Sequence, residues 1–168
     1  MKKEKFLTIY AVLDDESQKQ LTSLQNEILK MFPNGTQTMG IPFHISLGSF
    51  PVERKDDLLE KMDQIQKISE PSSIELIGLD HFNYQVIFAK PRLTKELEIL
   101  HKAFEGNYSD GFPWEPHITL YCGKEEEGIK ILEQFHLSLE KSFITGLELG
   151  EFFPTKILKN CKFNSKEK

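Results

Sequence analysis

Two short segments of the chain combine the same residue types in the same order. One reads FHISLG and the other PHITLY, so each has a histidine, an isoleucine, a hydroxyl residue and a leucine. On a β-strand alternate side chains share a face, so His44 is predicted to lie beside Ser46. By the same argument His117 lies beside Thr119, and the isoleucine and leucine of each segment anchor its strand. The repetition predicts that the two polar pairs form one site.

Two imidazoles and two hydroxyls are suited to the cleavage of a phosphodiester. Histidine titrates near neutral pH, so His44 and His117 can act as general base and general acid. Ser46 and Thr119 would donate hydrogen bonds to the non-bridging phosphate oxygens, where negative charge builds in the transition state. This scheme needs no metal ion and no cofactor. The similarity of the two segments leaves open which histidine is the acid and which is the base.

Aromatic residues near the two segments are further candidates for substrate binding. Continued alternation would place Phe50 on the face of the first histidine and Tyr121 on the face of the second. Either ring could stack on a base or pack the wall of the site. The same alternation turns Cys122 away from the site, toward buried packing. Trp114, just before the second segment, would form the floor of the cleft or fill the core.

The elements that must position these residues follow an order that occurs twice: helix, histidine-bearing strand, helix, strand, strand. Helices are predicted where hydrophobic residues recur at every third or fourth position, and strands where β-branched and aromatic residues dominate. Ser17 with Gln20 resembles a capping box at the start of the first helix, and a hairpin turn is expected near Asn83. We expect strands over residues 6–13, 42–50, 72–82, 84–90, 115–122, 142–153 and 155–163, and helices over residues 16–32, 55–68, 94–104 and 124–135.

The repeated order predicts an α+β fold in which two similar lobes face each other about a pseudo-two-fold axis. We expect a bilobal duplicated fold, with two mainly antiparallel sheets facing a central cleft and helices on the outside. No Pro-, Gly- or Ser-rich linker divides the sequence, so residues 1–168 are interpreted as a single bilobal domain with interleaved lobes. Its motif strands are placed near residues 43–50 and 114–122. Loops at 33–42 and 105–115 are expected to shape the mouth of the pocket.

Composition argues against several other classes of protein. The chain has 168 residues and a formal net charge of −5, so binding to long nucleic-acid duplexes is not expected. The two cysteines have neither metal-site spacing nor the density of a disulfide framework, which favours reduced thiols and a cytoplasmic location. The apolar run from Phe6 to Leu13 is short and lacks a small-residue cleavage site, so we interpret it as a strand and expect no membrane partner. A monomer is the default expectation.

The doubled motif resembles the hallmark of the two-histidine (2H) phosphoesterase superfamily, which contains 2'-5' RNA ligase-like proteins and cyclic nucleotide phosphodiesterases. HISL at residues 44–47 and HITL at residues 117–120 match its His-hydrophobic-Ser/Thr-hydrophobic pattern, about half a chain apart. The element order resembles that family over almost the whole chain. The resemblance implies acid and base roles for the two histidines and phosphate binding by the two hydroxyl residues. It also implies a nucleotide or RNA-end phosphodiester as substrate.

The residues after each motif differ from the bacterial RNA ligase-like branch, where a basic residue and an aromatic often follow the first motif. Here Gly48 and Ser49 follow the first motif, and Tyr121 and Cys122 follow the second. Together with the acidic net charge, this favours hydrolysis of a 2',3'-cyclic phosphate end, or of another cyclic or 2'-5' phosphodiester, with ligation as the reverse reaction. The alternative is a non-catalytic module that binds a nucleotide or an RNA end in the same cleft.

Overall fold

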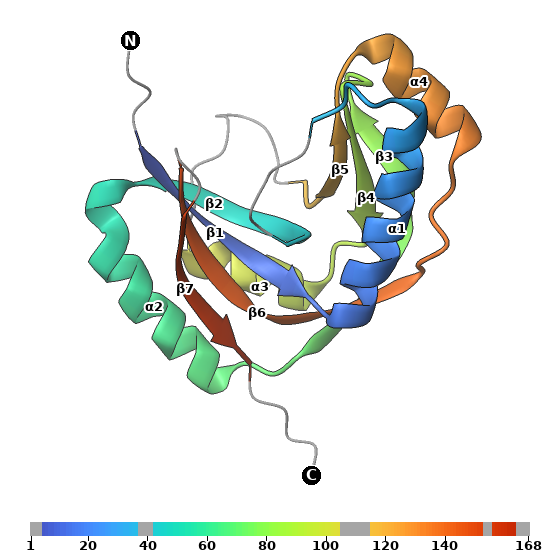
Figure 1. The fold of residues 1–168 in the computed structure, drawn as a ribbon. Helices are drawn as coiled ribbons and strands as arrows, with labels where there is room; N and C mark the ends of the chain where they lie inside the picture. Colours follow the sequence, from blue (N-terminus) through green and yellow to red (C-terminus); the bar gives the residue numbers. More distant parts are fainter. Residues whose placement is uncertain (1–4, 37–41, 105–114, 153–155, 164–168) are drawn as a thin grey trace.

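The computed structural model describes residues 5–36, 42–104, 115–152 and 156–163 (Figure 1). Over these residues the helices and strands follow the order expected from the sequence. Trp114 and most of the two predicted pocket-mouth loops lie outside the described residues. The strands are β1 (Phe6–Leu13), β2 (His44–Pro51), β3 (Ser72–Phe82), β4 (Val86–Pro91), β5 (Ile118–Cys122), β6 (Lys141–Phe152) and β7 (Lys156–Lys162). The helices are α1 (Asp15–Met31), the short 3-10 helix η1 (Val52–Arg54), α2 (Lys55–Ile68), α3 (Lys95–Phe104) and α4 (Glu125–Gln134).

The strands of the described residues form one antiparallel sheet with the hydrogen-bonded order β2-β1-β6-β3-β4-β5, and β7 pairs with β6. β3 changes partner along its length, because Ser72–Glu75 pairs with β6 and the strand pairs with β4 from Leu76 onward. Just after this change, Gly78 lies in the irregular stretch between Leu76 and Leu79 with a φ of 119°, a conformation that glycine adopts readily. The sheet therefore has a first half (β2, β1, β6 and β7) and a second half (β3, β4 and β5), inclined to each other in Figure 1.

The α+β class and the antiparallel strands predicted from the sequence are confirmed. The two sheets expected from the sequence are joined through β3, so hydrogen bonds run continuously from β2 to β5. The helices lie outside the sheet, as expected (Figure 1). The internal duplication and the single-domain organisation stay predictions.

Each helix that precedes a histidine-bearing strand packs on the opposite half of the sheet. α1 precedes β2 but contacts β5, and α3 precedes β5 but contacts β2. α2 covers β6 and β7 of the first half, while α4 contacts β3 and β4 of the second. This exchange of helices fastens the two halves of the sheet to each other. None of the described helices is long and apolar enough to cross a membrane.

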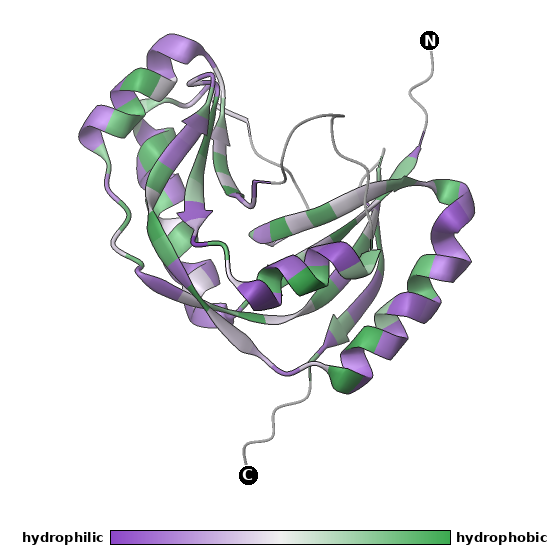
Figure 2. Ribbon diagram, turned by 180° about the vertical axis from the view of Figure 1, so that it is seen from behind, coloured by the Kyte–Doolittle hydropathy of each residue, from purple (hydrophilic) through white to green (hydrophobic). Residues whose placement is uncertain are grey.

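The hydrophobic core lies between the helices and the sheet, and β1 is its central strand. Leu7, Ile9 and Ala11 are fully buried on the helix side of β1, while Thr8 and Tyr10 alternate onto the other face. Burying a side chain such as Leu or Ile contributes about 1.5–3 kcal/mol, which holds the strand in register. The helices are amphipathic, and Figure 2 shows hydrophobic and hydrophilic residues together on α2. A second, smaller cluster lies under α1 and α4 and consists of Ile28, Phe32, Ile87, Tyr121 and Ile131.

The hairpin expected near Asn83 is confirmed. Asn83 and Tyr84 have φ angles of 53° and 57°, and the backbone N–H of Gln85 donates to the carbonyl of Phe82 at 3.0 Å. Two central residues with positive φ match the twist of the flanking strands, which is why asparagine is favoured in such turns. The turn fixes the pairing of β3 with β4, the strand beside β5.

The capping box predicted at the start of the first helix is wrong. Asp14 is the N-cap of α1, and its carboxylate accepts hydrogen bonds from the backbone N–H and the hydroxyl of Ser17 at 3.2 and 2.6 Å. The same carboxylate accepts from the hydroxyl of Ser142 and from the backbone N–H of Phe143 on β6. Asp14 therefore caps the helix and fastens it to the sheet, a tertiary role that the local pattern around Ser17 does not reveal.

Candidate active site

Both histidine motifs contain a β-bulge at the same position, the leucine. On β2, Ser46 pairs with Tyr10 and Gly48 pairs with Ile9, so Leu47 is an extra residue without a partner on β1. On β5, the motif leucine is likewise the extra residue, because Thr119 pairs with Phe88 and Tyr121 pairs with Ile87. A bulge shifts the alternation of side chains by one residue. The two motifs therefore share a backbone irregularity as well as residue types.

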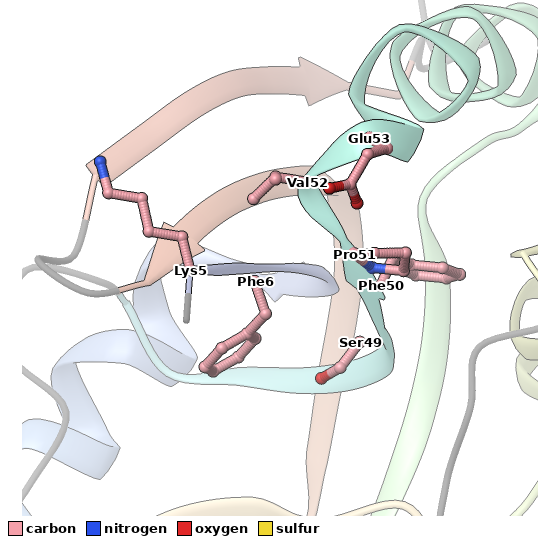
Figure 3. A pocket seen from close by; sticks show the side chains of 7 residues that line it. All are labelled: Lys5, Phe6, Ser49, Phe50, Pro51, Val52 and Glu53. Carbon is pink, nitrogen blue, oxygen red and sulfur yellow. The ribbon is translucent and has the colours of Figure 1, made fainter. Parts of the chain in front are cut away.

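The bulge on β2 corrects the predicted position of Phe50. Ser49, not Phe50, shares the face of Ser46 once the alternation has shifted. Phe50 is only 3% exposed and lies in the hydrophobic core, with the guanidinium carbon of Arg54 5.0 Å from its ring centroid. Figure 3 shows its ring directed away from the side chains of Ser49 and Phe6. The prediction that Phe50 lies on the His44 face is wrong.

The bulge on β5 has the same consequence for Tyr121. Its side chain is fully buried in the cluster under α1 and α4, its ring packs against that of Phe32, and its hydroxyl donates to Glu127 at 2.9 Å. Burial raises its pKa to about 12, with a further contribution from Glu127. The prediction that Tyr121 lies on the His117 face is wrong. Cys122 lies on the His117 face instead. It pairs with Val86, and Val86 pairs with Phe82, whose ring contacts that of His117.

The two histidine rings are held in the same way. Nδ1 of His44 lies 2.7 Å from the carbonyl oxygen of Pro42, and Nδ1 of His117 lies 3.0 Å from that of Glu115. A carbonyl oxygen only accepts hydrogen bonds, so Nδ1 carries the proton in both rings. Nε2 of each neutral ring then holds the lone pair. Both histidines are thus prepared to exchange a proton through Nε2.

The surroundings of the two rings differ. The ring of His44 lies against that of Tyr10, with 4.4 Å between centroids. Burial, the largest effect, lowers the pKa of His44, and the charge of nearby His117 lowers it further, although the hydrogen bond to Pro42 acts in the opposite direction. His117 meets the edges of Phe82 and Phe88 at centroid distances of 5.0 and 5.4 Å. His44 is therefore predominantly neutral at neutral pH.

The structure brings the two motifs together. β2 and β5 are in contact although they lie at opposite ends of the hydrogen-bonded order, and Figure 1 shows them approaching each other between the two halves of the sheet. The charge of one histidine acts on the pKa of the other. Ser46 and Thr119 are both partly exposed and occupy matching positions, two residues after each histidine and just before each bulge. A small ligand between β2 and β5 would meet both pairs.

A buried carboxylate beside the site has no counterpart in the sequence analysis. Glu148 on β6 pairs with Tyr10 and is 9% exposed. Its two oxygens accept hydrogen bonds from the Tyr10 hydroxyl at 2.7 Å and from Nδ2 of Asn160 at 2.6 Å. Burial, followed by the hydrogen bond and charge of Glu148, raises the pKa of Tyr10, so its hydroxyl stays protonated. The available signal was an acidic residue among the hydrophobic residues of ITGLELG, the segment that forms most of β6.

Among residues 5–36, 42–104, 115–152 and 156–163, no three His, Cys, Asp or Glu side chains are grouped so that they could hold a metal ion. Two imidazoles and two hydroxyls are the groups that the motifs place at the site. Groups of these types can transfer protons and donate hydrogen bonds to an anion.

The fold of this chain is similar to that of several solved structures, although its sequence is only distantly similar to theirs. The sequence matches no protein-family model and no curated protein. The structure is similar to LigT of E. coli complexed with ATP, with a TM-score of 0.68 and 15% identity over 98% of this chain and 100% of that chain. This chain has the LigT fold. TT0787 of Thermus thermophilus matches with a TM-score of 0.63 and 17% identity over 96% and 100% of the two chains. Usb1 of Kluyveromyces marxianus matches with a TM-score of 0.50 and 13% identity over 95% and 97%.

LigT and Usb1 are 2H phosphoesterases, so the fold expected from the doubled motif is confirmed. In this chain the crossed packing of α1 and α3 and the contact of β2 with β5 set the two motifs side by side. At these identities the likeness concerns the fold.

Proposed function

We propose that this chain is a 2H phosphoesterase that hydrolyses a cyclic phosphodiester, with a 2',3'-cyclic phosphate end of a nucleotide or RNA as its substrate. The observation that carries the proposal is the matched state of His44 and His117. Each ring donates Nδ1–H to the carbonyl two residues before it, each lies two residues before a hydroxyl side chain, and the charge of one acts on the other. LigT has been crystallised with phosphate and with 3'-AMP, which supports a phosphate-bearing nucleotide as the ligand class.

The difference between the two rings supports a division of roles. His44, whose pKa is lowered, is neutral and accepts a proton at Nε2 from the attacking water. The water oxygen forms a bond to phosphorus while the bond to one ribose oxygen breaks. His117, protonated at Nε2, gives its proton to that leaving oxygen. Exchange of protons with solvent restores both rings, and this scheme requires no metal ion or cofactor.

The hydroxyls of Ser46 and Thr119 donate hydrogen bonds to the two non-bridging oxygens. These oxygens carry the charge that grows in the transition state, and removal of one such donor typically lowers kcat by about 10²–10³-fold. Both hydroxyl residues project from strands, so they are positioned before the substrate arrives.

The test is hydrolysis of a panel of 2',3'-cyclic nucleotides by the wild-type protein and by the His44→Ala and His117→Ala variants. Loss of a general acid or base lowers the rate by about 10²–10⁴-fold. His136→Ala is the matched control, because His136 is exposed in the segment after α4 and away from both motifs. Excess EDTA is expected to leave the activity intact. Binding of cyclic nucleotides without any turnover would instead favour the non-catalytic module.

Both histidines come from one chain, which supports a monomer as the active form. Cys122 and Cys161 are unpaired thiols, in keeping with a cytoplasmic location. Gel filtration and the cellular location of the tagged protein test these two proposals.

A further inference from the structure

Glu148 is a buried carboxylate beside the site that takes no part in the proposed acid–base scheme. It lies in a row of side chains that crosses three neighbouring strands, from Ser46 on β2 through Tyr10 on β1 to Glu148 on β6. Its oxygens accept hydrogen bonds from the Tyr10 hydroxyl at 2.7 Å and from Nδ2 of Asn160 at 2.6 Å. Burying a carboxylate costs free energy even when it is hydrogen-bonded, and apolar residues of similar volume often replace such groups without loss of stability. A role in the site would explain why the row keeps it.

The contacts of Tyr10 connect this carboxylate to His44. The ring of Tyr10 is fully buried and lies against the imidazole, with 4.4 Å between the centroids. It also passes close to the backbone of Gly150, since a Cβ atom there would lie 3.5 Å from Cε1 of Tyr10. The hydrogen bond to Glu148 fixes the hydroxyl end of the ring. The imidazole is therefore held by a fixed wall at its face and by the Pro42 carbonyl at Nδ1, and together these contacts set the direction of Nε2.

Among the residues described by the structure, the matching row of the second half of the sheet lacks this anchor. Phe88 pairs there with Asp80, so an acidic residue occupies the position that corresponds to Glu148. Phe88 has no hydroxyl to donate, and the carboxylate of Asp80 forms an ion pair with Lys90 at 3.3 Å instead. The hydrogen bond between ring and carboxylate is thus a feature of the half that carries His44.

The direction of Nε2 matters most for a general base that activates water. In the proposed scheme His44 takes its proton from a water molecule, which no covalent bond holds in place, whereas His117 protonates an oxygen that belongs to the substrate. The base must therefore orient the water toward phosphorus as well as accept its proton. A misplacement of about 1 Å can lower a rate by about 10²-fold.

We propose that Glu148, acting through Tyr10, is a positioning residue for His44. The hydrogen bond between them holds the Tyr10 ring in the orientation that points Nε2 of His44 at the attacking water. This inference rests on the proposed phosphoesterase function and adds to it a residue outside both histidine motifs.

The test measures kcat and KM for 2',3'-cyclic AMP, together with urea unfolding, for the wild-type protein and for Tyr10→Phe, Glu148→Leu and the double variant Tyr10→Phe/Glu148→Leu. We expect kcat to fall by about ten-fold in all three variants, less than the effect of a 1 Å misplacement, while KM stays close to the wild-type value. Each single variant leaves a buried polar group without its partner, whereas the double variant removes both partners, which can be nearly neutral for stability. Asn160 is exposed, so water can replace its partner. The double variant should therefore recover stability but not kcat.

Two further variants separate the hydrogen bond from other effects of the substitution. Glu148→Gln keeps an oxygen that accepts from the Tyr10 hydroxyl, so it should recover most of the kcat that Glu148→Leu loses. Glu151→Leu is the matched control and should keep the wild-type kcat. Glu151 lies on the same strand but on the opposite face, where it pairs with Leu7 and forms an ion pair with Lys5.

A double-mutant cycle tests whether Glu148 acts through His44. In a His44→Ala background there is no imidazole to position, so Glu148→Leu should lower the residual kcat no further. In a His117→Ala background the base is still present, and Glu148→Leu should lower kcat by the same factor as in the wild-type protein. Two groups that act independently would instead give the same factor in both backgrounds.

The possible outcomes separate this proposal from the proposed function. Recovery of kcat together with stability in the double variant, or an equal effect of Glu148→Leu in the two histidine backgrounds, overturns the positioning role and leaves the phosphoesterase intact. Failure of the wild-type protein to hydrolyse the cyclic nucleotide, or a wild-type rate in His44→Ala, overturns the proposed function and the positioning role with it.

Discussion

The ring of Tyr10 lies against the ring of His44, with 4.4 Å between their centroids and an interplanar angle of 44°. Tyr10 is fully buried, and its hydroxyl is fixed by the 2.7 Å hydrogen bond that it donates to Glu148. A buried carboxylate thus sets the position of the ring that supports a histidine of the site. The corresponding ring in the second half is Phe88, which pairs with Thr119 as Tyr10 pairs with Ser46.

Replacing Tyr10 with phenylalanine tests this support. Tyr10→Phe keeps the ring but removes a donor from the buried Glu148, which then depends on Asn160 alone. We expect the free energy of unfolding at pH 7 to fall by about 1–3 kcal/mol, the effect of an unsatisfied buried group. Urea unfolding measures this change. Tyr84→Phe is the control, because Tyr84 is 37% exposed in the hairpin turn and should change stability by no more than about 0.5 kcal/mol. Equal effects of the two substitutions would contradict the argument.

The lowered pKa of His44 predicts the acidic side of the pH–rate profile. If His44 is the general base, activity is lost only when it becomes protonated, so the acidic limb of kcat/KM lies below pH 6.5, the ordinary value for histidine. Steady-state rates on a cyclic nucleotide between pH 4.5 and 9 measure it. An acidic limb at or above pH 6.5 would assign the base to another group.

The same shift predicts how stability depends on pH. In the unfolded chain His44 binds a proton near pH 6.5, whereas in the folded protein its pKa is lower. The contribution of His44 to stability is therefore present above pH 6.5 and is lost as the pH falls toward the folded pKa. His101, whose pKa is also lowered by burial, acts in the same direction. His44→Gln removes one of these two contributions. Urea unfolding from pH 7 to pH 5 should therefore give a shallower decline for the variant than for the wild type, and identical declines would refute the shift.

Hydrophobic periodicity was sufficient to locate the elements, but it did not reveal the bulges. The strand over residues 6–13 and the helix over 55–68 agree with β1 and α2, because their apolar residues recur at the spacing of one buried face. Phe50 and Tyr121 were misplaced because the prediction assumed uninterrupted alternation after each histidine motif. The extra residue at Leu47 is defined by pairing with β1, a partner more than thirty residues away in the chain.

The roles of His44 and His117 were predicted from repetition, whereas the groups that support them depend on distant contacts. Glu148 lies next to Tyr10 only because β6 pairs with β1, and the sequence contains no spacing that relates the two residues. The exchange of α1 and α3 between the halves of the sheet is equally invisible to local patterns. Repetition therefore identified the candidate reacting groups, and the tertiary fold determines their surroundings.

The buried position of Tyr121 gives a prediction that separates the core from the substrate site. Tyr121→Leu removes a ring from the cluster under α1 and α4, and we expect the free energy of unfolding to fall by about 2 kcal/mol. Because the ring does not reach the His117 face, KM for a cyclic nucleotide should stay at the wild-type value in the folded protein. Thermal unfolding and steady-state kinetics measure the two quantities. A raised KM with unchanged stability would restore Tyr121 as a substrate-binding residue.

The packing of α4 on the hairpin predicts an unusual response to a glycine substitution. A Cβ atom on Gly128 would lie 1.7 Å from the carbonyl oxygen of Tyr84, so α4 must move away from the turn in Gly128→Ala. Alanine normally stabilises a helix interior by roughly 0.5–1 kcal/mol relative to glycine. Here we expect the free energy of unfolding to fall by about 2 kcal/mol or more, because the steric clash outweighs the gain in helix propensity. Thr22→Ala on the exposed face of α1 is the control and should raise stability slightly. Urea unfolding of both variants checks the sign, and a stabilising effect of Gly128→Ala would show that α4 does not rest on the β3–β4 turn.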